Sequence, residues 1–211
     1  MSKIRIKYSK TGRAKYISHL DLSATLQRAF LRAGVKLKYS EGFNPHPYIS
    51  VALPLSVGFE SICELVDVAI VGESLPDIET IKLPEGIAID EIYLPTQKFS
   101  KIKWVQISAR LNYDRQIDDE LVKNIKSILT QDSIVISKRS KRGINDIDIA
   151  PHIKDVDVTH DECILITAKI SAQEPTLNGG DLINALGEDY KPDHMEVRRI
   201  DLYDANMKQF V

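Results

Sequence analysis

Two short stretches of the 211-residue chain carry side chains suited to acid–base chemistry or to anion binding. SEGFNPHP, residues 40–47, places Asn44 and His46 each directly before a proline, and YISHLD, residues 16–21, contains His19. A histidine titrates near neutral pH, so it can accept or donate a proton or bind a phosphate. His19 and His46 are therefore the candidate catalytic residues, with an ordinary surface position as the alternative for His19.

The first of these stretches is expected to be a stiff loop. Its two prolines fix their own φ angles and push the residues before them, Asn44 and His46, toward extended geometry. Phe43 and Tyr48 offer aromatic faces on which a base could stack. For Phe43 the favoured interpretation is that the ring fills an edge of the core, whereas Asn44 and His46 are expected to contact a ligand.

The second stretch has the pattern of a helix start. Ser18 and Asp21 stand three residues apart, which is the spacing of a capping box and explains both without a ligand. A divalent site built from His19, Asp21 and His46 is a weaker alternative, so no metal site is predicted.

The helix that follows is the clearest element in the chain. Its apolar residues recur at the spacing of one helical face, Ser18 can cap its start and Gly34 can end it. Around it we expect strands at 4–8, 35–39, 49–55, 63–71 and 88–94, and a short helix near 76–82.

The same order of elements returns in the second half. We expect strands at 104–111, 133–137, 163–170 and 195–203, and helices at 118–131 and 179–189. Cys63 and Cys163 each open an extended stretch, and Ser18 and Asp118, the two candidate caps, stand at the same interval of 100 residues. This indicates an internal duplication.

The predicted fold class is α+β, with two tandem ferredoxin-like (βαββαβ) units built on antiparallel sheets. The units are expected at 1–95 and 102–211, with a linker through 94–101. A single irregular α+β domain is the alternative.

Composition excludes several classes of protein. The hydrophobic fraction of 43% is that of a globular chain, and no run approaches the roughly 18 apolar residues of a membrane span, so a cytoplasmic protein is expected. The two cysteines predict neither a disulfide framework nor a zinc site. Phosphate-loop, dinucleotide-binding, metalloprotease and iron–sulfur motifs are missing from the sequence, so no cofactor is expected.

Positive charge is concentrated in two segments. Residues 1–50 hold ten Lys or Arg against two acids, and residues 101–150 hold ten against seven, although the net charge of the chain is −2. A basic surface attracts phosphate groups, and ferredoxin-like sheets and loops are frequent platforms for single-stranded RNA. A solvated helix face explains Arg28 and Arg32 equally well. The residues expected to bind RNA are Arg13, Lys15, His19, Arg28, Arg32, Lys38, Asn44, His46, Tyr48, Lys138, Arg139, Lys141 and Arg142.

The block from Ser18 to Ser61 resembles the radical-SAM-associated domain family of unknown function, which occurs alone or joined to B12-binding radical-SAM proteins. The resemblance is close over residues 3–70, with a looser echo in SKRGINDIDIAPHI, which ends at Ile153. Residues of the family motif present here are Ser18, His19, Asp21, Ser40, Glu41, Gly42, Phe43, Asn44, Pro45 and His46. The resemblance implies that any radical-SAM enzyme is a separate partner. The chain is also similar, at the level of fold only, to the RNA-processing endonucleases of CRISPR systems.

Two hypotheses of function follow. The first is a noncatalytic RNA-binding or substrate-presenting module that works beside an enzyme modifying tRNA or ribosomal RNA. The second is a metal-independent endoribonuclease, in which His19 or His46 activates a ribose 2′-hydroxyl and a nearby cation stabilises the phosphorane. The lack of a catalytic or cofactor motif favours the first.

Overall fold

A computed structural model describes residues 2–72, 74–140 and 143–211, with the side chains of residues 139 and 140 outside the described set. The strands are β1 (Ser2–Lys10), β2 (Ile49–Val51), β3 (Glu60–Ile70), β4 (Ile87–Tyr93), β5 (Trp104–Asn112), β6 (Val135–Ser140), β7 (Gly143–Asp148), β8 (Ile153–His160), β9 (Ile164–Ser171) and β10 (His194–Tyr203). The helices are α1 (His19–Arg32), α2 (Asp119–Leu129) and α3 (Gly179–Asn184). The chain divides into two compact units, residues 1–101 with 211 and residues 102–210.

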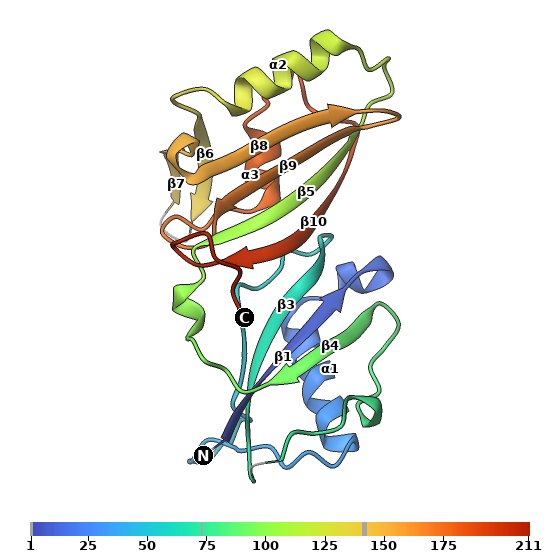
Figure 1. Ribbon diagram of the computed structural model, residues 1–211, viewed down its shortest axis with the longest axis vertical. Coiled ribbons are helices and arrows are strands. Elements are labelled where there is room, and N and C mark those ends of the chain that lie inside the picture. The colour runs from blue at the N-terminus through green and yellow to red at the C-terminus, as the bar shows by residue number, and fades with distance from the viewer. Residues whose placement is uncertain (1, 73, 141–142) are drawn as a thin grey trace. The chain divides into compact units, whose positions relative to one another are not determined.

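The first unit carries an antiparallel sheet in the order β4-β1-β3-β2. Ile4 and Ile6 of β1 stand opposite Val68 and Val66 of β3, so the four side chains share one face of the sheet. Helix α1 covers this face and lies behind the strands in Figure 1. The residues that α1 buries against the sheet are Leu22, Leu26, Ala29 and Phe30.

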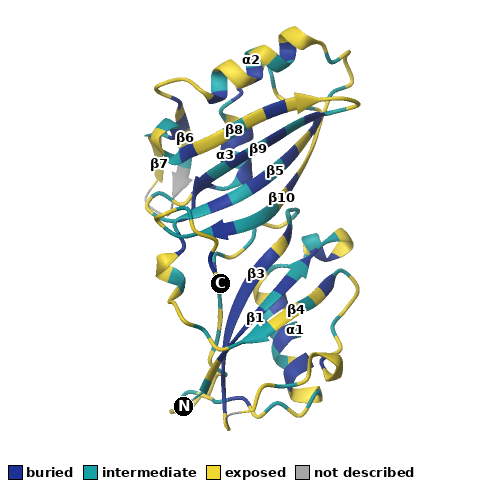
Figure 2. Ribbon diagram, in the orientation of Figure 1, coloured by how far each residue is buried: buried dark blue, intermediate teal, exposed yellow. Residues whose placement is uncertain are grey.

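Helix α1 forms as its sequence predicts. The four buried residues fall at helical spacing, and the Asp21 N–H donates to the Ser18 Oγ at 3.2 Å, which caps the first turn. Asp118 caps α2 in the same way, since its Oδ1 accepts from the Leu121 N–H at 2.8 Å. Figure 2 shows both helices with a buried side and an exposed side. Local sequence therefore accounts for the two long helices.

Two predicted strands of the first unit are shorter than expected. Residues 35–39 form only isolated bridges at Leu37 and Tyr39, and the strand expected at 49–55 ends at Val51. Pro54 follows closely, and Leu53 has a φ of 44°, a conformation that ends extended pairing. The predicted short helix near 76–82 is a single 3-10 turn, Ile78–Thr80.

The second unit repeats this strand order. Its antiparallel sheet runs β10-β5-β9-β8, so in both units the first strand of the sheet lies between the last strand and the third. Helix α3 approaches β10 so closely that a Cβ on Gly179 would overlap the Val197 Cγ1. A glycine is therefore required where α3 begins.

Strands β7 and β8 were not predicted from sequence. β7 pairs with β6 as a separate two-stranded sheet, and β8 forms an edge of the main sheet of the second unit. Both read as polar, GINDID and IKDVDVTH, because each is largely exposed. GINDID carries little apolar alternation, whereas DVDVT in β8 alternates over only five residues and its register is broken between Lys154 and Asp157.

Residues 94–101, expected as a linker, pack against the first unit. The Arg5 Nη2 donates to the Gln97 carbonyl at 2.7 Å, and the Phe99 ring centroid lies 4.3 Å from the Arg5 guanidinium carbon. The same guanidinium makes a two-point ion pair with Asp67, Nε to Oδ1 at 2.7 Å and Nη2 to Oδ2 at 3.1 Å. This buried arginine joins β1, β3 and the end of the unit.

Tyr113 gives the second unit a measurable dependence on alkaline pH. Burial raises the pKa of Tyr113 to about 12, and the Tyr113 hydroxyl donates to the Tyr190 carbonyl at 2.7 Å. Because the folded state favours the neutral phenol, this stabilisation is complete below the ordinary pKa of 10.0 and is lost as pH rises toward about 12. Ultraviolet titration of tyrosinate should show a component near 12 that disappears in Tyr113→Phe. Exposed Tyr16 is the control, because Tyr16→Phe should leave the component near 12 in place. If that component were still present in Tyr113→Phe, the prediction would be wrong.

Candidate functional site

The stretch SEGFNPHP lies in a hydrogen-bonded loop, residues 39–48, called the loop below. Tyr39 and Pro47 form an isolated antiparallel bridge across its base. Next to them, the Ser40 N–H donates to the His46 carbonyl at 2.8 Å, and the His46 N–H donates to the Ser40 Oγ at 3.0 Å. The backbone at His46 is therefore held from both sides.

The loop is anchored on the end of β3. The Lys38 N–H donates to the Ala69 carbonyl, and the Ala69 N–H donates to the Tyr48 carbonyl, both at 2.9 Å. One residue of β3 thus holds both ends of the loop. Such anchoring limits the conformational entropy that the loop loses when it binds a ligand.

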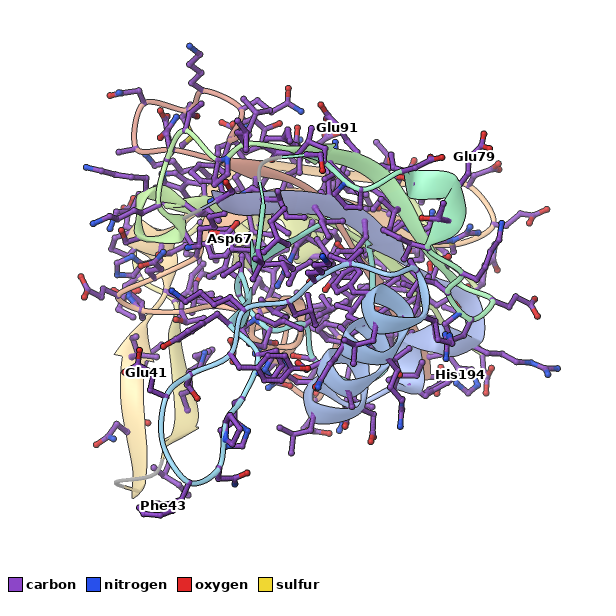
Figure 3. The ribbon with its side chains drawn as sticks, turned by 90° about the horizontal axis from the view of Figure 1, so that it is seen from below. Glu41, Phe43, Asp67, Glu79, Glu91 and His194 are labelled. Atoms are coloured by element: carbon purple, nitrogen blue, oxygen red, sulfur yellow. The ribbon has the colours of Figure 1, made fainter. Side chains whose placement is uncertain are left out.

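The tip of the loop is fully exposed, and this corrects the expectation for Phe43. Its ring was expected to fill an edge of the core, but it is the most exposed of the large hydrophobic side chains. Figure 3 shows Phe43 at the far end of the loop, away from the body of the first unit. Gly42 has a φ of 119°, which a side chain rarely adopts, so the turn before Phe43 depends on glycine. The sequence analysis missed the exposure of Phe43, although its position between Gly42 and Asn44 in a polar turn indicates an exposed side chain.

The start of α1 is explained by capping alone. The Ser18 Oγ, besides accepting from the Asp21 N–H, donates to the Asp21 Oδ2 at 2.7 Å. The side chains of Ser18 and Asp21 are therefore hydrogen-bonded to each other. His19 is the first residue of the helix and is exposed.

The basic residues of α1 lie toward its C-terminal end. Arg28 and Arg32 are four residues apart, hence on one side of the helix, and both are exposed. The Arg32 Nη2 donates to the Lys82 carbonyl at 3.3 Å. Cations near a helix C-terminus are also favoured by the helix dipole. Two positive side chains are therefore presented to solvent here.

The loop emerges at this C-terminal end of α1. After the helix, the Val35 N–H bonds to the Phe30 carbonyl, and the Val71 N–H then donates to the Lys36 carbonyl at 2.8 Å. The chain therefore passes from α1 directly to the end of β3, where the loop is anchored. We call the exposed or partly exposed residues of this end of α1 and of the chain that follows it the loop surface: Arg28, Arg32, Lys36, Lys38, Phe43, Asn44, His46 and Tyr48. The segment from residue 22 to residue 48 contains a single acid, Glu41.

The start of α1 lies at the opposite end of the sheet. Lys10, the last residue of β1, stands opposite Ser61 near the start of β3, and its Nζ donates to the carbonyl of Ile17, just before α1, at 2.7 Å. Ser61 and Ala69 are eight residues apart, about 26 Å along an extended strand. Helix α1 thus begins at one end of the sheet and finishes at the end that carries the loop.

This arrangement separates the predicted site residues into two groups. Arg13, Lys15 and His19 lie near the start of α1, whereas the predicted residues of the loop surface lie at the other end. His19 and His46 are not brought together, so a joint metal site with Asp21 is not formed. Within residues 2–72, 74–140 and 143–211, no group of three His, Cys, Asp or Glu side chains could hold a metal ion.

The second basic segment supplies less positive charge than its sequence indicates. The Lys138 Nζ donates to the Asp181 Oδ2 and to the Thr176 carbonyl, both at 2.6 Å, so its charge is compensated inside the second unit. The Arg139 side chain, Lys141 and Arg142 lie outside the described residues.

The strand order and helix placement define a mixed α and β protein with mostly antiparallel sheets and few helices. The chain belongs to the family described as "Uncharacterized protein conserved in bacteria (DUF2344)", whose model matches residues 3–178. No curated protein matches the chain in sequence. No helix in the described part of the chain is both long and apolar enough to cross a bilayer.

The solved structures that match this chain include the following two. One is a chain of the "Crystal Structure of a Cbf5-Nop10-Gar1 Complex", with a TM-score of 0.53 and 12% identity over 94% of this chain. This protein spans 48% of that chain, about half its length, and the likeness concerns the fold alone. The other is Thermus thermophilus Cse3 bound to an RNA representing a pre-cleavage complex, with 12% identity over 92% of this chain and 98% of that chain. Its TM-score of 0.21 does not establish a shared fold.

Proposed function

We propose that the protein binds single-stranded RNA through the loop surface. Four exposed or partly exposed cations there, Arg28, Arg32, Lys36 and Lys38, suit the phosphates of a flexible strand. Phe43 and Tyr48 are exposed aromatic rings on the loop that follows this end of α1, and every base offers a face for stacking on such rings. Asn44 and His46 add polar groups that can bond to base edges.

The observation that carries this proposal is the exposure of Phe43 on an anchored loop. An isolated ring at a flexible tip would have no particular meaning, because single exposed apolar side chains are common. Here, however, the tip is preceded by a glycine turn, its base is hydrogen-bonded, and Lys36 and Lys38 lie in the chain just before the loop. An exposed ring on a loop that is anchored at its base fits an unpaired nucleotide better than a protein core.

The role we infer is that of an accessory module without catalytic activity of its own. In this role the protein would present tRNA or ribosomal RNA to a separate modification enzyme, and the sequence resemblance to radical-SAM-associated domains makes a radical-SAM enzyme the partner of choice. The identical strand order of the two sheets supports reading the chain as two tandem ferredoxin-like units. The alternative is an endoribonuclease in which one histidine acts alone, since His19 and His46 lie at opposite ends of the first unit.

The proposal is tested by the salt dependence of RNA binding. Unstructured RNA of mixed sequence is titrated against the intact protein at several salt concentrations, and the affinity is expected to fall steeply as salt rises. The double variant Arg28→Ala, Arg32→Ala should bind about tenfold more weakly and lower the slope of log K against log salt by about 1.4, because each lost phosphate contact on a single strand removes about 0.7.

A matched variant with two charges removed at the other end of α1 serves as the control. Arg13→Ala with Lys15→Ala changes the net charge equally, and it should leave the slope close to that of the unmodified protein. Equal losses in both double variants would show that binding is not localised on the loop surface. A slope near zero for the unmodified protein would remove the proposal altogether.

A further inference from the structure

A second surface, in the second unit, has the features of a docking site for an extended peptide. A pocket of about 490 Å³ lies between β6 and the segment that follows α3. Its volume is within the range of about 300–1,000 Å³ found for binding pockets. The apolar residues lining it include Val135, Ile183 and Met195, and both Val135 and Met195 are exposed.

The pocket lies against the edge of β6. Three consecutive residues of this strand, Val135, Ile136 and Ser137, line it. Side chains alternate between the two faces of a strand, so a cavity over one face would be lined by alternate residues. A cavity lined by three in succession lies beside the backbone edge.

The hydrogen-bond register shows which backbone groups lie at this edge. β6 pairs only with β7 in the described sheets, and the Ile149 N–H donates to the Ile134 carbonyl at 2.8 Å. In an antiparallel pair, residues alternate between bonding to the partner strand and pointing away from it. Ile136 therefore bonds to β7, whereas the N–H and C=O groups of Val135 and Ser137 point away from β7.

The edge is held in place from both ends. At one end, the Asp148 Oδ1 accepts from the Ile134 N–H at 2.9 Å and from the Ala150 N–H at 3.0 Å, and these bonds hold the pKa of Asp148 below its usual value. At the other end, Lys138 is bound to Asp181 of α3. Figure 1 shows β6 and β7 as a separate pair of ribbons beside the main sheet of this unit.

We propose that this edge binds an extended segment of a partner protein, which adds to β6 as a third strand. An unpaired strand edge provides the main-chain hydrogen bonds, and the apolar lining takes alternate side chains of the added segment. Of the charged lining residues, Glu188 and Lys191 form an ion pair at 3.2 Å, which leaves the Asp193 carboxylate as the net charge, so basic residues in the segment are favoured and a polyanion is not. This surface is thus distinct in chemistry from the loop surface, and the inference does not rest on RNA binding.

The test uses a library of random peptides of about nine residues, displayed on phage and selected against the intact protein. Enriched peptides should carry alternating apolar residues with Lys or Arg beside them. An enriched peptide is then synthesised and its affinity for the protein is measured. Ser137→Pro removes an outward N–H without removing a bond to β7, and it should weaken the binding of this peptide about tenfold or more. Ser137→Ala, which keeps the N–H, should bind within about twofold.

Amide hydrogen exchange on the unmodified protein gives a second readout that needs no variant. The amides of Val135 and Ser137 should exchange readily in the free protein and become protected when the peptide is bound. Failure to enrich any peptide, equal binding to Ser137→Pro, or protection elsewhere would overturn the inference. The inference would also be overturned if the unmodified protein formed a dimer that Ser137→Pro dissociates, because a second copy of the chain would then occupy the edge of β6. RNA affinity of Ser137→Pro should equal that of the unmodified protein, which separates this result from the test of the loop surface.

Discussion

Replacing Asp67 by alanine is expected to lower the free energy of unfolding of the first unit by about 3–5 kcal/mol. The Arg5 side chain is 0% exposed and that of Asp67 only 3%, and the two groups share the two-point contact described above. Removing the carboxylate leaves a buried guanidinium without its counter-charge, which costs more than the ion pair itself contributes. Lys3, whose Nζ lies 3.1 Å from the Asp67 Oδ2, also loses a partner.

The size of this effect is large compared with total stability, since a domain is stabilised by about 5–15 kcal/mol. Urea unfolding followed by circular dichroism measures the loss. The control is the double variant Arg5→Met, Asp67→Leu, which removes both charges and should cost much less than Asp67→Ala alone. A loss below about 1 kcal/mol for Asp67→Ala would show that the Arg5 charge is compensated by other groups.

Replacing Phe43 by alanine is expected to weaken the binding of single-stranded RNA by about 5- to 150-fold, because stacking of one base on an aromatic ring contributes about 1–3 kcal/mol. The change should leave the free energy of unfolding unaltered, since the ring makes no contribution to the core. Affinity is measured by fluorescence anisotropy of a labelled RNA, and stability by urea unfolding of the same preparations.

Leu20 provides a matched control for Phe43. It is also a large exposed apolar residue, at 78% exposure, but it lies in the first turn of α1, at the end of the unit away from the loop. Leu20→Ala should leave RNA affinity within about twofold of the unmodified protein. Equal weakening by both variants would point to a general loss of surface apolar area, and no weakening by Phe43→Ala would exclude the stacking contact.

The Arg5 and Asp67 ion pair and the exposed Phe43 ring have different places in the first unit. Ala69 holds both ends of the loop on β3, and β3 is joined to β1 by the Arg5 and Asp67 pair. A disturbance of that pair should therefore reach the loop through β3. The aromatic tip itself carries no part of this framework.

Local features of the fold were predictable because neighbouring residues decide them. The spacing of Leu22, Leu26 and Phe30 predicted α1, and Ser18 and Asp118 were correctly identified as caps. The stiffness of the proline-containing stretch stays a prediction, because it rests only on the restriction that a proline places on its own φ and on the residue before it. Each of these depends on residues within one or two turns of the chain.

Other features depend on contacts between distant segments, and no local pattern reports them. Arg5 and Asp67 are 62 residues apart, and only the register of β1 against β3 places them together. The assignment of Phe43 to the core was wrong because aromatic character indicates burial only on average, and the loop projects from the end of β3 into solvent. β7 was missed because its exposed, polar sequence has little periodicity, and β8 because its alternation, DVDVT, is short and interrupted by a register shift.

The sequence by itself determined the long helices and the charged first segment, both of which follow from residue type and short-range spacing. Only the tertiary structure decided that His19 and His46 lie apart, that Lys138 is neutralised by Asp181, and that the edge of β6 faces a pocket. The physical reason is that backbone hydrogen bonding between strands sets the distance between remote residues, and that pairing is not written in the residues themselves.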